Sequence, residues 1–180
     1  MQLQSGPDPF AVLGIEPRFD LDTAQLEARF RERSREVHPD RFVGAPAGER
    51  AAALVQTRAL NDAYQVLKKP QRRAEQLLAR HGVAIDERER LEPAFLMEIL
   101  ELREELAAAR VAGAIDRVNL LAADMRARQR ALFDGLGRRF AALGGDDDAV
   151  VLAAIKHDLI TLRYVGRYVD ECDAALDAAE

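Results

Sequence analysis

Apolar residues recur along most of the chain at spacings of three and four, the pattern that predicts amphipathic α-helices. The first predicted helix is very short, because Asp8 suits the N-cap, Pro9 the first helical position and Gly14 the stop. A stronger start signal follows where Asp22 and Gln25 are spaced as a capping box. The chain is therefore expected to open with one short helix and one longer, capped helix.

The longer helix is predicted to form one arm of a helical hairpin. It should run to about Val37, because Pro39 biases the residue before it out of helical geometry. Residues 38–48 contain two prolines and two glycines, a composition typical of a loop. A third helix is predicted over about 49–68, so the loop lies at the tip between two antiparallel helices. The apolar residues that share one face of the third helix are Leu60, Ala63, Tyr64 and Leu67.

The rest of the chain also has helical periodicity. A connecting helix is predicted over about 71–80, and the charged residues 86–92 are interpreted as a solvated linker. Three further helices with short connections predict an antiparallel three-helix bundle. Their expected ranges are about 94–110, 114–142 and 147–178.

The predicted fold is all-α and L-shaped, with an N-terminal hairpin module joined to a C-terminal three-helix bundle. The expected boundaries are 8–70 for the hairpin module, 71–92 for the connecting helix and linker, and 93–180 for the bundle.

Composition agrees with a folded helical protein and excludes several classes. Apolar residues make up 48% and charged residues 32% of the chain, and tryptophan is absent. Residues 1–80 carry 13 Lys and Arg against 11 Asp and Glu, whereas residues 81–180 carry 13 against 20. Neither half has the basic excess of a nucleic-acid-binding protein. No apolar run approaches the roughly 20 residues needed to cross a bilayer.

Other ionisable residues add little chemistry. The single cysteine, Cys172, excludes an internal disulfide or a site built on several thiolates, and is interpreted as a small buried residue. His157 and Asp158 are interpreted as a surface pair, so neither a metal site nor a cofactor is predicted. The N-terminus lacks the basic start and apolar run of a signal peptide, so a cytoplasmic protein is expected.

The tripeptide at the predicted tip, His38-Pro39-Asp40, is the strongest candidate for a functional site. Pro39 makes the loop entrance rigid, Asp40 offers a carboxylate to an arginine of a partner, and His38 can donate or accept. The arginine-rich face of the second helix would speed the encounter with an acidic partner. The arginines predicted to contact that partner are Arg29 and Arg33 on this helix and Arg41 after the tripeptide. The alternative is that Asp40 caps a turn and His38 is simply solvated. A catalytic dyad is disfavoured, since a tip is not a pocket.

Three stretches resemble the J domain, the module that stimulates ATP hydrolysis by DnaK-type chaperones. They are DPFAVLG at 8–14, HPDRF at 38–42 and LNDAYQVL at 60–67. The resemblance covers residues 8–68 and implies that the tripeptide and the neighbouring arginines contact such a chaperone.

The helix predicted over 94–110 has two apolar rows. The first is an ordinary core stripe formed by Phe95, Ile99, Leu102 and Leu106. The second contains Leu96 and Leu100, is extended by Met97 and is edged by charge. Periodicity alone leaves open whether this second row is extra core or an exposed contact surface. The charged residues along its edge are Glu101, Arg103 and Glu104.

The stretches PQRRAEQLL at 70–78 and AFLMEILELREEL at 94–106 resemble the HscB family of J-proteins, which serve iron–sulfur cluster biogenesis. The resemblance implies an HscA-type chaperone partner and binding of an IscU-type scaffold protein by the second row. It also implies a co-chaperone without covalent chemistry or a bound cluster of its own. The scaffold contacts carried over to this sequence are Leu96, Met97, Leu100, Glu101, Arg103, Glu104 and Tyr164.

Two rival interpretations remain at this stage. A J-protein with a different client would keep the effect on the chaperone ATPase but would not bind an IscU-type scaffold. A plain helical adaptor, in which the tripeptide is accidental, would not stimulate an ATPase at all.

Overall fold

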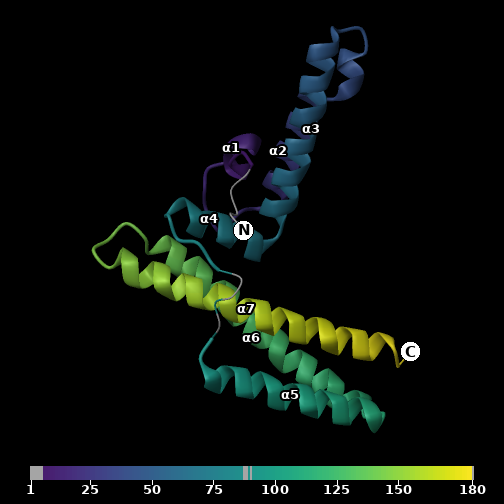
Figure 1. Cartoon of the computed structure of the whole chain (residues 1–180), viewed down its shortest axis with the longest axis vertical. Helices are drawn as coiled ribbons and strands as arrows, with labels where there is room; N and C mark the ends of the chain where they lie inside the picture. Colours follow the sequence, from purple (N-terminus) through teal and green to yellow (C-terminus); the bar gives the residue numbers. More distant parts are fainter. Residues whose placement is uncertain (1–5, 87–88, 90, 180) are drawn as a thin grey trace. The chain divides into compact units, whose positions relative to one another are not determined.

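The structure is a computed structural model that describes residues 6–86, 89 and 91–179, and it confirms the all-α fold (Figure 1). These residues form α-helices and one 3-10 helix, η1, without a β-strand. The chain divides after Arg80 into two compact units. Within the described residues, no helix is long and apolar enough to span a membrane. The elements are α1 (Pro9–Leu13), α2 (Thr23–Glu36), η1 (Pro39–Phe42), α3 (Ala47–Lys68), α4 (Pro70–Arg80), α5 (Pro93–Val111), α6 (Ile115–Ala141) and α7 (Asp148–Asp177).

The short helix α1 forms as its sequence predicts. The Asp8 carboxylate accepts the N–H of Phe10 at 3.0 Å, and Gly14 ends the helix with a φ of 64°. A five-residue helix has little stability of its own, because helix nucleation is unfavourable. Packing on α3 holds it instead, with Phe10 and Leu13 fully buried.

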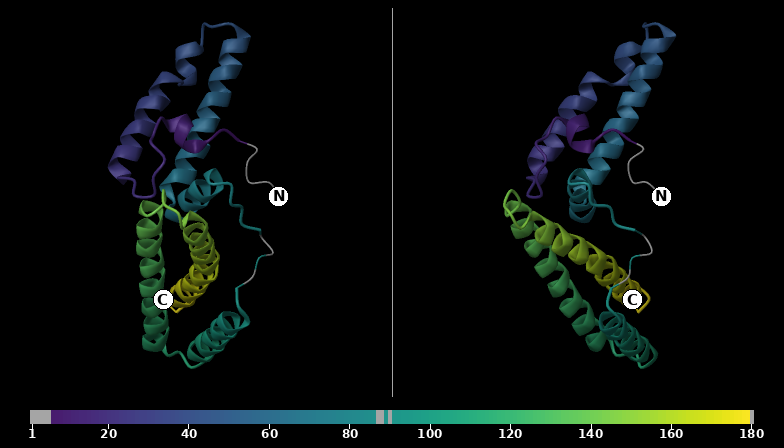
Figure 2. Two further views of the ribbon diagram at one scale, coloured as in Figure 1. Left: turned by 90° about the vertical axis from the view of Figure 1, so that its left-hand side faces the viewer. Right: turned by 60° about the vertical axis from the view of Figure 1, so that its left-hand side comes forward.

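Helices α2 and α3 form the antiparallel hairpin (Figure 2). Asp22 caps α2 by accepting the N–H of Ala24 at 2.8 Å. Leu26 is buried, and Phe30 stacks on Tyr64 of α3 with ring centroids 4.3 Å apart. The two arms of the hairpin are therefore joined by aliphatic and aromatic packing along their facing sides.

The segment predicted as a loop contains a short helix. Pro39–Phe42 form η1, and α3 already begins at Ala47. Proline has a φ suited to the first helical position, and the His38 side chain caps the turn, so this segment can form one 3-10 turn. The tip is consequently more ordered in conformation than a loop of Pro and Gly suggests.

Helix α4 is attached to the hairpin by a buried arginine. Arg73 is 8% exposed; its Nη1 donates to the carbonyl of Leu67 at 2.8 Å, and its guanidinium lies 5.3 Å from the Phe19 ring centroid. Burial lowers the pKa of Arg73 below its ordinary value. An ion pair between Arg80 and Asp8 adds a second connection. The predicted connecting helix therefore belongs to the first compact unit.

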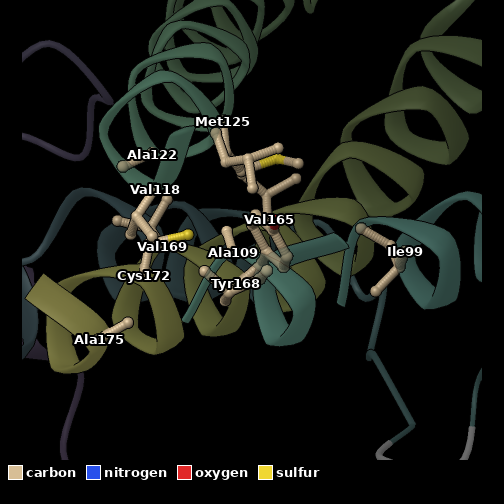
Figure 3. Packing of buried hydrophobic residues seen from close by; sticks show 12 residues of the cluster. Ile99, Ala109, Val118, Ala122, Met125, Val165, Tyr168, Val169, Cys172 and Ala175 are labelled. Carbon is tan, nitrogen blue, oxygen red and sulfur yellow. The ribbon is translucent and has the colours of Figure 1, made fainter. Parts of the chain in front are cut away.

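The second unit is the predicted three-helix bundle, in which α6 and α7 make the longest contact. Figure 3 shows its apolar core. Tyr168 of α7 is fully buried and donates its hydroxyl proton to the Leu102 carbonyl of α5 at 2.9 Å. Cys172 is fully buried, as predicted. The buried members of this core cluster are Ile99, Leu106, Ala109, Val118, Leu121, Ala122, Met125, Val165, Tyr168, Val169, Cys172 and Ala175.

Two details of the second unit correct the sequence analysis. Asp158 is 7% exposed and pairs with Arg139 of α6 at 2.5 Å, so it is not the surface partner of His157. Gly135 makes room for this pair, because a Cβ there would lie 2.8 Å from Nη1 of Arg139. The linker is also less solvated than expected, since Leu91 is 7% exposed.

Candidate functional site

The tripeptide lies between α2 and α3, at the end of the hairpin, with Asp40 strongly exposed. The Asp40 side chain is 85% exposed and the His38 side chain 56%. Nδ1 of His38 accepts the N–H of Asp40 at 3.3 Å. In the neutral ring this places the proton on Nε2, which becomes a donor, while the carboxylate of Asp40 remains an acceptor. The geometry therefore presents one donor and one charged acceptor side by side.

The predicted basic face of α2 is less basic than its arginines suggest. Arg29 pairs with Glu32 at 2.7 Å and Arg33 pairs with Glu36 at 3.3 Å. Exposed pairs of this kind are weak, about 0–1 kcal/mol each, so the carboxylates of a partner can compete for the arginines. Glu32 and Glu36 each stand three residues after the arginine that they pair with, a spacing from which these pairs could have been predicted.

Arg41, also predicted as a chaperone contact, has an intramolecular role. Its Nη1 donates to the carbonyl of Arg35 at the end of α2, at 3.2 Å. The side chain is exposed at the tip, beside Asp40 in sequence. Arg41 can therefore contribute positive charge to the tip while it stabilises the end of α2.

The structure decides between the two interpretations of the second apolar row on α5. Met97 is 55% exposed and Leu100 is 50% exposed, whereas Leu96 is half-buried. The helix packs into the bundle through its other row, in which Ile99 and Leu106 are buried. The second row is therefore surface. The α5 face is the name used below for the surface formed by Leu96, Met97, Leu100, Glu101, Arg103 and Glu104.

The charged residues along the edge of the α5 face differ in exposure and in pairing. Glu101 and Glu104 are exposed. Arg103 forms a two-point ion pair with Glu171 of α7, with its Nε at 3.0 Å and its Nη2 at 2.6 Å from the two carboxylate oxygens. Bidentate pairs are directional, so Arg103 holds α5 against α7 as well as lining the face.

Tyr164 of α7 is half-buried and packs edge-on against Phe95 of α5, with ring centroids 5.9 Å apart. The guanidinium of Arg128 lies 5.0 Å from the centre of the same Phe95 ring and pairs with Glu98 at 2.6 Å. The role of Arg128 was not predictable from the sequence, because its place depends on how α6 packs against α5. Phe95 thus supports Tyr164 at the N-terminal part of α5.

A capped helical hairpin with an exposed His-Pro-Asp tripeptide, followed by a helical bundle, defines a J-domain co-chaperone. The family comparisons agree with this class. The DnaJ domain family matches residues 8–75, and the HSCB C-terminal oligomerisation domain family matches residues 91–173.

The chain belongs to the HscB co-chaperone family. It is 34% identical to the co-chaperone protein HscB homolog of Azoarcus sp. (strain BH72), over 100% of this chain and 99% of that protein. The homolog of Neisseria meningitidis is 39% identical over 73% of this chain and 81% of its own. The structure of HscB from Vibrio cholerae matches with a TM-score of 0.81 at 30% identity, over 97% of this chain and 100% of that chain. The structure of human HscB matches with a TM-score of 0.80 at 26% identity, over 95% of this chain and 83% of that chain.

Proposed function

We propose that this protein stimulates the ATPase of a DnaK-type chaperone of the HscA class and delivers an IscU-type iron–sulfur scaffold protein to it. The observation that carries the proposal is the apolar row that α5 leaves exposed. The module boundaries belong to the same proposal: 8–70 acts on the chaperone, 93–180 binds the scaffold, and 71–92 connects them, although its helix α4 packs within the first compact unit. A cytoplasmic location is part of the same proposal.

The chaperone half of the proposal depends on the tripeptide. Asp40 offers an exposed carboxylate that can accept a charge-assisted hydrogen bond from an arginine of the chaperone. The ring of His38 offers its Nε2 proton to the same contact. Arg29, Arg33 and Arg41 would contact an acidic surface of the chaperone. Arg29 and Arg33 would exchange their weak pairs with Glu32 and Glu36 for the carboxylates of the chaperone.

The scaffold half depends on the α5 face. A binding surface needs apolar side chains that are exposed in the free protein, and Met97 and Leu100 are half exposed. Methionine adapts its shape to a partner, and the carboxylates of Glu101 and Glu104 would set the register of binding. Tyr164 would add an aromatic contact from α7.

The test is the steady-state ATPase rate of the chaperone, measured with this protein and without scaffold. We expect stimulation by the wild type and by His81→Gln, which changes another exposed histidine, and loss of stimulation in His38→Gln. Equal stimulation by His38→Gln would exclude the J-protein mechanism. Calorimetry with an IscU-type scaffold tests the second half, and absence of binding would favour a J-protein with another client.

A further inference from the structure

Two side chains replace backbone hydrogen bonds that the chain loses around the tripeptide. Pro39 has no N–H, so the carbonyl of Arg35 cannot receive the hydrogen bond that a helix would supply from four residues ahead. Nη1 of Arg41 donates to this carbonyl instead, at 3.2 Å. The last turn of α2 is thereby completed from the other side of the tripeptide.

The carbonyl of Val37 loses its helical donor for a related reason. That donor would be the N–H of Arg41, but in η1 this N–H donates to the carbonyl of His38 at 3.0 Å. The hydroxyl of Thr57 on α3 lies 3.1 Å from the carbonyl of Val37 and donates to it. This partly buried hydrogen bond joins the two arms of the hairpin at the base of its tip.

The hydroxyl of Thr57 has a second acceptor within reach. It lies 2.9 Å from the carbonyl of Ala53, one turn earlier on α3. That carbonyl already receives the backbone N–H of Thr57 in the regular helix, so it gains little from a second donor. The carbonyl of Val37 gains more, because a partly buried acceptor without a partner costs free energy.

We propose that Thr57 is a positioning residue for the tripeptide. By holding the carbonyl immediately before His38, its hydroxyl sets the direction in which His38 and Asp40 leave α2. Thr57 acts through Val37 and does not itself contact the chaperone. The inference rests on the proposed function, since it concerns how the tripeptide meets that partner.

Removal of the hydroxyl has a specific kinetic consequence. The tip would then populate several directions, and only a fraction of molecules would present Asp40 correctly. The concentration needed for half-maximal stimulation rises in inverse proportion to that fraction, while saturation recovers the full maximum. Loss of one hydrogen bond lowers the equilibrium constant for the correct direction about threefold to tenfold, and this factor is the upper limit of the rise. His38→Gln differs, because it removes a contact and lowers the maximum.

The experiment titrates the chaperone ATPase with the full-length wild type and three variants. Thr57→Val removes the hydroxyl and keeps the β-branched shape, and Thr57→Ser restores the hydroxyl. Thr161→Val is the matched control, because the Thr161 hydroxyl donates to the carbonyl of His157 on its own helix at 3.0 Å. Amide chemical shifts of residues 37–42 are measured for each protein by NMR.

We expect only Thr57→Val to need more protein, up to about tenfold more, at an unchanged maximum. We also expect only Thr57→Val to alter the amide shifts of residues 37–42. Wild-type behaviour of Thr57→Val would overturn the proposal, and so would equal weakening in Thr57→Ser. If the wild type itself does not stimulate, the proposed function fails. The positioning role is then decided by whether the tip shifts change in Thr57→Val and return in Thr57→Ser.

Discussion

Met97 and Leu100 are the side chains by which the proposed scaffold site can be tested most sharply. They are 55% and 50% exposed, the highest exposures among the apolar residues of the α5 face. Their truncation to alanine removes apolar surface that a bound scaffold would cover. It does not remove a fully buried anchor of the bundle, so the folded state should survive.

The expected loss of scaffold-binding free energy follows from the exposed fractions of the two side chains. Full burial of a Leu or Met side chain is worth about 1.5–3 kcal/mol, so covering the exposed half is worth about 1 kcal/mol. Each single substitution should therefore weaken scaffold binding about fivefold. The double variant Met97→Ala/Leu100→Ala should weaken it about thirtyfold if the two contributions add.

The assay is isothermal titration calorimetry of the scaffold protein with each variant. Leu120→Ala is the matched control, because Leu120 is a 55% exposed leucine on α6. It should cost similar stability in a thermal melt and leave scaffold affinity unchanged. An affinity of the double variant within twofold of the wild type would refute the assignment of the α5 face. If Leu120→Ala weakened scaffold binding equally, the loss of affinity would not be specific to the α5 face.

Three further predictions concern stability and reactivity. Arg73→Ala removes a buried side chain and its hydrogen bond to Leu67, so it should lower the free energy of unfolding by about 2–3 kcal/mol in urea; an unchanged urea midpoint would contradict this. The N–H groups of Gly144 and Gly145 donate to the Asp148 carboxylate and hold its pKa below the ordinary value of an aspartate. Its charge therefore stabilises the folded state above the unfolded-state pKa, and this is lost as pH falls through the folded-state pKa. The difference in melting temperature between the wild type and Asp148→Asn should disappear in acid, and a pH-independent difference would contradict this. Burial raises the pKa of Cys172, so thiol reagents should label it only on unfolding, and rapid labelling of the native protein would count against its burial.

Helix boundaries were predictable from the sequence because their signals are local. Asp8, Gly14 and Asp22 act through neighbours two to four residues away, and the structure places them at the expected ends of α1 and α2. The 3-10 turn at Pro39 was not predicted although its cap is equally local, because histidine is not one of the usual N-cap residues, and here the His38 ring accepts the N–H of Asp40.

Features that depend on packing between helices were not predictable. Periodicity identified two apolar rows on α5, but exposure depends on how many helices cover it. Burial of Asp158 depends on a glycine, Gly135, in a different helix. The support that Arg128 gives to Phe95 likewise depends on how α6 packs against α5. Such contacts join residues that are distant in sequence, so a one-dimensional pattern does not contain them.

In the proposed function, one molecule of this protein connects the chaperone to the scaffold. A connecting molecule raises the effective concentration of scaffold at the chaperone, so less free scaffold is needed for an effect. The most direct measurement is the scaffold concentration that gives half-maximal chaperone ATPase, with and without this protein. The wild type should lower this half-maximal scaffold concentration. Met97→Ala/Leu100→Ala should return the concentration toward the value without this protein, and this variant should still stimulate the ATPase in the absence of scaffold. An equal lowering by the wild type and the double variant would contradict the claim.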